Sequence, residues 1–94
     1  MEGHSVISPD VLARYAADAA LVVPGVHEVF ETPLQRRGVK VAGDEVEVHL
    51  LVEFGVVFPD VAAAVQARVT DYLLRMADVR PSAVNVVIDE VARP

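Results

Sequence analysis

The clearest pattern in the chain is an alternation of apolar and polar side chains along residues 45–54. A period of two is typical of a β-strand with one face in the core and the other face toward solvent. We therefore predict a strand here, ended by Gly55. The predicted inward side chains are Val46, Val48, Leu50, Val52 and Phe54, and the predicted outward ones are Glu45, Glu47, His49, Leu51 and Glu53.

Two other stretches repeat apolar residues every three or four positions, which is the spacing of an amphipathic helix. The first begins at Ser8, a capping residue, and Pro9, which suits the first helical position, and it ends at Pro24-Gly25. The second begins at Pro59 and runs for about five turns. The predicted buried stripes are Leu12, Ala16, Ala19 and Val23 in the first helix, and Val61, Val65, Val69, Tyr72, Leu73 and Met76 in the second.

Three more strands are predicted, at residues 26–31, 39–42 and 84–89. Gly43-Asp44 separates two valine-rich runs and is a turn signal, so the strands on either side of it should form a hairpin. The order is then helix, strand, strand, strand, helix, strand. This order predicts an α+β fold: a two-layer sandwich in which both helices pack on one face of a four-stranded mixed sheet.

The bulk composition restricts the class of protein. The 94 residues predict a single domain over residues 1–94, with a core over about residues 6–91, and 53% of the residues are hydrophobic. There is no Cys, which excludes a disulfide framework, a thiolate metal site and a cysteine nucleophile and fits a reducing cytoplasm. The formal net charge of −6 disfavours nucleic-acid backbones and anionic lipid surfaces. No apolar run approaches the about 18 residues of a membrane span, so no direct membrane insertion is expected.

The candidate catalytic and metal-ligating residues are scattered. The three histidines, His4, His27 and His49, have neither the spacing of a paired metal motif nor a Cys to complete one. Only His49, which shares a strand face with Glu47, keeps open a metal-binding or small-molecule-binding regulatory domain as an alternative. The glutamates of residues 45–53 fit a solvated sheet face, and the chain lacks a nucleophile elbow and a phosphate-binding loop. We therefore predict no enzyme activity and no cofactor.

A protein-binding surface is the remaining candidate. Leu51 interrupts the polar face of residues 45–54, and Val87 takes the corresponding outer position in the last strand. If those strands are neighbours, the two side chains form a small apolar island beside His49, suited to self-association or to a partner. Arg36-Arg37 is a second candidate, for an acidic partner. A small nucleic-acid-binding module is a further alternative, although the chain has neither a basic groove nor the Gly-x-x-Gly loop of a KH module.

Five fragments in order give the chain a family resemblance. They are Ser8-Pro9-Asp10-Val11-Leu12, Val23-Pro24-Gly25-Val26, Val52-Glu53-Phe54-Gly55, Phe58-Pro59-Asp60-Val61 and Val84-Asn85-Val86-Val87-Ile88. With this spacing the chain resembles the alkaline shock protein 23 family of bacterial general and envelope stress proteins, over roughly residues 6–91.

The resemblance implies a function. Members of that family are cytoplasmic, have no recognised catalytic site and are associated with cell-envelope homeostasis. Some self-associate, and some are held beneath the membrane by a membrane-anchored protein partner. The resemblance therefore implies a non-catalytic envelope stress protein that works through protein contacts, with Leu51, Val87, His49, Arg36 and Arg37 as candidate interface residues.

Overall fold

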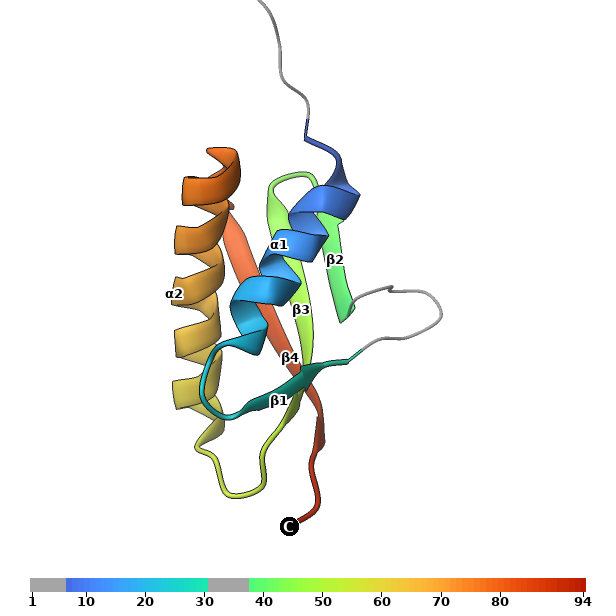
Figure 1. The fold of residues 1–94 in the computed structure, drawn as a ribbon, viewed down its shortest axis with the longest axis vertical. Coiled ribbons are helices and arrows are strands. Elements are labelled where there is room, and N and C mark those ends of the chain that lie inside the picture. The colour runs from blue at the N-terminus through green and yellow to red at the C-terminus, as the bar shows by residue number, and fades with distance from the viewer. Residues whose placement is uncertain (1–6, 31–37) are drawn as a thin grey trace, which may run out of the picture.

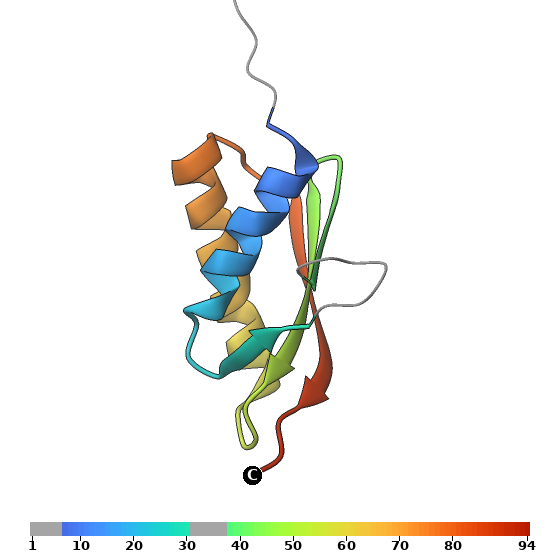
Figure 2. The same cartoon turned by 45° about the vertical axis from the view of Figure 1, so that its right-hand side comes forward.

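A computed structural model of the chain describes residues 7–30 and 38–94. Both helices lie on one face of the sheet, and no helix of the described residues lies on the other face (Figures 1 and 2). The predicted α+β class, the two-layer arrangement and the order of the elements are confirmed. In chain order the elements are α1 (Pro9–Leu21), β1 (Val26–Val29), β2 (Val39–Ala42), β3 (Glu45–Val52), α2 (Phe58–Ala77) and β4 (Ala83–Val91).

The start of α1 follows from its capping residue. The Ser8 side chain accepts a hydrogen bond from the Val11 backbone N–H at 3.2 Å, and Pro9 occupies the first turn. The buried residues of α1 are Leu12, Ala13, Ala16, Ala17, Ala19 and Ala20. The five alanines among them let α1 lie close to α2 and to the sheet.

β3 is the central strand of the sheet. β2 runs antiparallel to its first half and β1 runs antiparallel to its second half, while β4 runs parallel along the whole of its other edge. The connection from β3 to β4 passes through α2, which packs back onto the sheet, as a crossover between parallel strands requires. The sheet is therefore mixed, with two antiparallel pairings and one parallel pairing.

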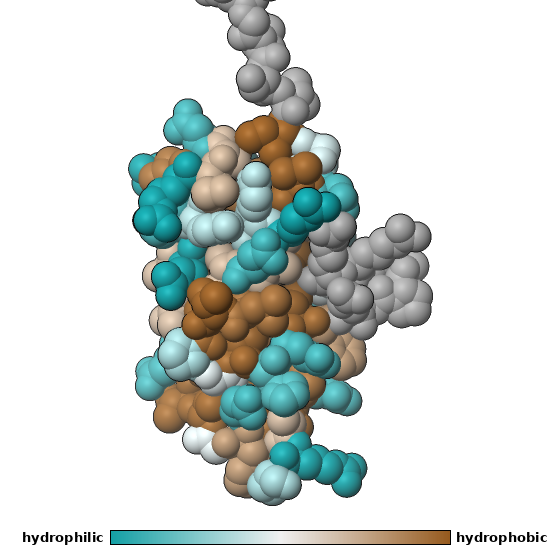
Figure 3. Space-filling view, viewed as in Figure 1, coloured by the Kyte–Doolittle hydropathy of each residue, from teal (hydrophilic) through white to brown (hydrophobic). Residues whose placement is uncertain are grey.

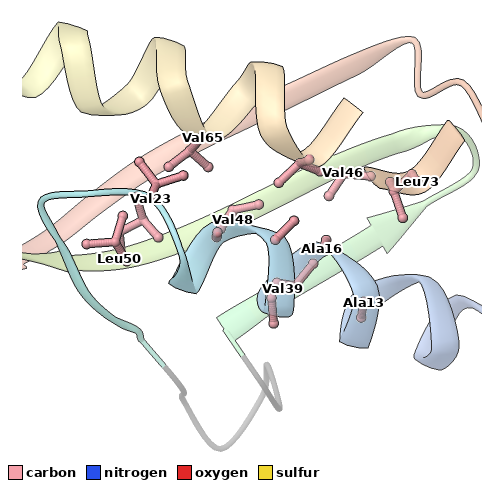
Figure 4. Close-up of a cluster of buried hydrophobic side chains, with 14 of the residues drawn as sticks. Ala13, Ala16, Val23, Val39, Val46, Val48, Leu50, Val65 and Leu73 are labelled. Carbon is pink, nitrogen blue, oxygen red and sulfur yellow. The ribbon is translucent and has the colours of Figure 1, made fainter. Parts of the chain in front are cut away.

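The core lies between the inner face of β3 and the two helices. Leu50 and Val48 on β3, and Val65 and Leu73 on α2, have no exposed surface. Figure 4 shows these side chains meeting those of α1 and β2. Each side chain of this size that is removed from water stabilises the fold by about 1.5–3 kcal/mol, so this row supplies much of the driving force for folding.

The structure corrects the predicted end of the third strand. β3 ends at Val52, and Phe54, predicted to point inward, is 65% exposed. The Glu53 backbone N–H donates to the Gly25 carbonyl at 2.8 Å, and Gly55 then adopts a φ of +90° that only glycine reaches without strain. The chain turns out of the sheet before Phe54 can reach the core.

Met76 and the ends of the first helix and first strand also differ from the prediction. Met76 is 49% exposed although it continues the apolar stripe of α2. The buried residues of α2 end at Leu73, so the last turn of the helix, which carries Met76, extends beyond the core. The first helix ends at Leu21, earlier than predicted, and the first strand ends at Val29, while residue 31 lies outside the described residues.

Asp78 ends α2 in the left-handed conformation, with φ 53° and ψ 35°. Its backbone N–H reaches the carbonyls of Leu73 and Leu74, which closes the last turn of the helix. Glycine is the residue that usually takes this position, since it has no Cβ to clash. The short polar side chain of aspartate is one of the few alternatives.

Candidate functional site

The outer face of the sheet, turned away from both helices, carries the candidate residues of β3. Burial alternates along the strand, with Val46, Val48, Leu50 and Val52 buried and the residues between them more exposed. His49 lies directly opposite Val87 of β4, and Glu47 lies opposite Asn85. The neighbouring strands thus bring polar and apolar side chains of the outer face together.

His49 is held between two carboxylates. Its Nε2 lies 2.7 Å from Glu47 Oε2, and its Nδ1 lies 2.7 Å from Asp89 Oδ2. An ionised carboxylate can only accept hydrogen bonds, so both ring nitrogens must carry a proton to make both contacts. The geometry therefore favours a charged imidazolium between two negative groups.

The surroundings of His49 act on its pKa in opposite directions. Burial lowers the pKa, since the imidazole side chain is only 16% exposed. The hydrogen bonds to Glu47 and Asp89, together with the negative charges of these groups, outweigh burial. The net result is that the pKa of His49 is raised above its ordinary value of 6.5.

Asp89 reaches His49 because of an irregularity in β4. Leu50 pairs with Ile88, but the next residue of β3, Leu51, pairs with Glu90, so Asp89 is an extra residue in the ladder. Such a bulge re-aims side chains locally. The contact between His49 and Asp89 was not predicted from the sequence, where 40 positions separate the two residues.

The apolar island predicted on this face is partly assembled by the fold. β3 and β4 are neighbours, and Leu51 lies two positions along β3 from His49, the residue opposite Val87. Both Leu51 and Val87 are half-buried. Their role in an interface stays a prediction, and Arg36 and Arg37 lie outside the described residues.

The other histidine on the described part of the chain makes one exposed contact. His27 Nδ1 lies 3.1 Å from Glu53 Oε1, and both side chains are about half exposed. Within residues 7–30 and 38–94, no three acidic or histidine side chains have the arrangement of a metal site. The described residues therefore add no support to the metal-binding alternative.

A surface missed by the sequence reasoning lies at one end of the molecule. We call it the apolar end, and its exposed residues are Leu21, Val22, Phe54, Val57, Phe58 and Val91. The turn before β1 and the loop after β3 meet here, since the Gly25 carbonyl binds the Glu53 N–H and Gly25 lies against Val56. The Ala92 N–H donates to the Val52 carbonyl and brings the end of β4 alongside.

The apolar end is visible from the helix side of the molecule. Figure 3 shows apolar side chains gathered where α1 ends and where α2 begins. A signal for it exists in the sequence, because two of only three phenylalanines flank the short loop after Gly55. The period of two stops in this loop, so its apolar residues have no regular face to bury.

A shallow depression of about 570 Å³ lies between α1 and β1. Arg14 and Asp18 of α1 line it, together with Glu28 and Phe30. Its lining combines charged side chains of both signs with apolar ones, and nothing in the lining forms a nucleophile–base pair. The depression therefore indicates no particular chemistry.

The fold and these surfaces define a small α+β sandwich protein, and neither described helix is long and apolar enough to cross a membrane. The chain belongs to the alkaline shock protein 23 family, whose model matches residues 1–93 and is described as having a cell envelope-related function. The resemblance inferred from the sequence fragments is thereby confirmed.

Two individual proteins are similar to this chain. The uncharacterised protein YqhY of Bacillus subtilis (strain 168) is 35% identical over 99 aligned positions, which span 89% of this chain and 73% of YqhY. The manganese form of the MamM CTD has a similar structure, with a TM-score of 0.51 and 17% identity over 86% of this chain and 96% of that one. At this identity the second likeness concerns the fold alone.

Proposed function

We propose that this chain is a non-catalytic protein of cell-envelope homeostasis and envelope stress, which works in the cytoplasm by self-association and by contact with a membrane-anchored protein. Its membership of an envelope-related family supports the first part. The apolar end supports the contact with a membrane-anchored protein, because Phe54, Val57 and Phe58 are 65%, 59% and 45% exposed. Exposed apolar groups gathered at one place are characteristic of interaction sites.

The charge around the apolar end indicates the kind of partner. Glu53, Asp60 and Glu90 are exposed beside its apolar residues, and the chain as a whole carries a formal net charge of −6. Acidic groups are repelled by anionic lipid headgroups. A protein surface with an apolar centre and basic residues around it is therefore the better complement, and it would hold the chain near the membrane without insertion.

The outer sheet face is assigned to self-association. Leu51 and Val87 lie there on neighbouring strands, and neither belongs to the apolar end. Each is half-buried, so the island gains from further coverage by a second molecule. Two separate surfaces allow one copy to bind both a neighbour and the anchored partner.

A membrane sedimentation experiment tests the partner. Purified chain is mixed with membrane vesicles from the native cells, with the same vesicles after protease treatment, and with protein-free liposomes of their extracted lipids. We expect binding to the untreated vesicles only. The double variant Phe54→Ser and Phe58→Ser should bind at least about tenfold more weakly, equivalent to about 1.4 kcal/mol.

Met76→Ser is the matched control, since Met76 is 49% exposed but lies at the opposite end of α2 from Phe58. It should sediment as the wild type does. Equal binding to protein-free liposomes would mean that lipid, rather than a protein, holds the chain. Unchanged binding of the double variant would remove the apolar end from the interface.

A further inference from the structure

The outer edge of β4 is free of a neighbouring strand. β4 is nine residues long and, within residues 7–30 and 38–94, pairs only with β3. A strand edge of this length presents a row of backbone N–H and C=O groups suited to another strand. Figure 1 shows β4 at the side of the sheet, with α2 as the nearest helix.

The composition of β4 leaves most of this edge unprotected. Natural proteins usually guard free edges with charged side chains, prolines or bulges. Residues 83–88 contain neither a charge nor a proline, and the acidic residues Asp89 and Glu90 and the bulge come only at the far end. Charges and the bulge therefore protect only the last part of the strand. At the start of β4 the Gln66 side chain of α2 donates a hydrogen bond to the Val84 carbonyl at 3.1 Å, so an incoming strand would have to displace that side chain.

The side chains on the inner face of β4 are also incompletely covered. Val84, Val86 and Ile88 pack against the core but stay half-buried, whereas Val46, Val48 and Leu50, which pair with them on β3, are buried. The core layer thus ends partway across β4. A further strand beside β4 would continue the sheet and cover this row from its open side.

The alternation in β4 permits an antiparallel pairing of the strand with itself. In an antiparallel pair, directly opposed side chains point to the same face. When Val86 opposes Val86 of a second copy, Val84 opposes Ile88 on the inner face and Asn85 opposes Val87 on the outer face. All seven residues from 83 to 89 then match in face. Moving the two-fold axis to Val87 would oppose Val84 to Glu90, across the bulge, and break the match.

This register also avoids charge repulsion. The only charged residue among positions 83–89 is Asp89, and it opposes Ala83 of the second copy. Like charges directly opposed across strands are destabilising, and none occurs here. The edge is thus complementary to itself in face and in charge.

We propose that a second copy of this chain binds along β4 in antiparallel orientation, with the two-fold axis at Val86, to form one continuous sheet. This inference rests on the self-association in the proposed function, and it adds a contact along the edge of the sheet to the one assigned to the outer face. It also doubles the apolar island. Val87 of each copy comes beside Asn85 of the other, so the Leu51 and Val87 pairs of both copies line one outer face.

Disulfide trapping tests the register, since the chain contains no Cys. We would prepare Asn85→Cys and Val87→Cys separately and oxidise each alone and the two mixed. Opposed residues have Cα atoms about 4.5–5.5 Å apart, within disulfide range, whereas position 85 lies diagonally from position 85 of the second copy, at about 7–8 Å. We expect several-fold more disulfide dimer from the mixture than from either variant alone.

Lys40→Cys is the matched control, because Lys40 is an exposed residue of β2, which lies at the other edge of the sheet from β4. Mixed with Val87→Cys, it should give only background crosslinking. If light scattering shows dimers but the mixture of Asn85→Cys and Val87→Cys forms no disulfide dimer, the β4 interface is wrong while self-association stands. If the chain stays monomeric at high concentration, self-association itself is wrong. Preferential trapping of Asn85→Cys with itself would overturn the register.

A second variant measures the interface directly. Val86→Lys would bring two like charges together at the two-fold axis. We expect its dimer to dissociate at least about tenfold more readily, as measured by analytical ultracentrifugation, with a thermal transition that shows a folded chain. A folded Val86→Lys with unchanged dimer affinity would place the interface elsewhere.

Discussion

The two faces of β3 are built from neighbouring residues but follow different rules. On the inner face Val46, Val48, Leu50 and Val52 are at most 2% exposed and belong to the apolar core. On the outer face Glu47, His49 and Leu51 keep partial contact with solvent. The size of the side chains decides which residues fit the inner face, whereas charge and hydrogen bonding organise the outer face.

This difference means that the inner face mainly determines the stability of the fold, whereas the outer face carries the candidate interaction residues. A buried apolar row must be filled by side chains of the right size, because an interior leaves few voids. The outer face has no such demand, and yet it holds a histidine with 2.7 Å contacts to two carboxylates. Variants that distinguish the faces therefore distinguish folding from interaction.

The largest expected effect is on the inner face. Leu50→Ala removes a fully buried side chain and leaves a cavity, so we expect the free energy of unfolding to fall by about 3 kcal/mol in urea denaturation. Leu51→Ala, one residue away on the outer face, should lower it by less than about 1 kcal/mol. Equal losses would show that the two faces do not differ as described.

The next effect is on assembly. Leu51→Glu or Val87→Glu puts a charge into the apolar island, and we expect self-association to weaken by about tenfold in light scattering across a concentration series. The same variants should keep most of their thermal stability, because both residues are only half-buried. A wild type that stays monomeric at high concentration would remove the assembly function from this face.

A pH-dependent effect follows from His49. Since its pKa is raised in the folded chain, protonated His49 stabilises the fold. This contribution is complete below the ordinary value of 6.5 and is lost as the pH rises through the raised pKa. His49→Gln lacks it, so the stability advantage of the wild type over this variant should be larger at about pH 6 than at about pH 9.

The control for that experiment is His27→Gln. The His27 and Glu53 side chains are about half exposed, and exposed pairs of this kind contribute little. Denaturant unfolding at both pH values should show a smaller change than for His49→Gln. An advantage of wild type over His49→Gln that does not vary with pH would mean that His49 is not charged between its carboxylates.

The smallest expected effect marks the end of β3. Phe54→Ala should change the free energy of unfolding by no more than about 0.5 kcal/mol, because Phe54 is 65% exposed, whereas Val52→Ala should cost more than about 1 kcal/mol. Thermal unfolding of the two variants is sufficient to compare them. A large loss of unfolding free energy in Phe54→Ala would show that Phe54 packs in the core after all.

Local signals in the sequence were sufficient for most of the fold. The alternation at residues 45–52, the turn at Gly43-Asp44 and the cap at Ser8 each depend on neighbouring residues, and each is confirmed. Phe54 was misplaced because an apolar residue after a strand continues the pattern whether or not the backbone does. The period alone cannot show where a strand leaves its neighbours.

The candidate site was less predictable, since it depends on pairings between distant strands. Glu47 and His49 were recognised as sharing a face, but Asp89 joins them through a bulge that no local pattern indicates. The apolar end likewise arises where three connections meet. The free edge of β4 follows from the strand order, which the sequence leaves open.

The position of β4 after α2 also has a consequence for synthesis on the ribosome. Residues 53–82 separate β3 from β4, and at about 5–20 residues per second they take roughly 2–6 s to make. By the end of that interval β1, β2 and β3 have been made, but the edge of β3 that pairs with β4 still lacks its neighbour. The nascent chain is then at its most vulnerable to mispairing with another copy, so a delay in translation within α2 would be expected to increase aggregation.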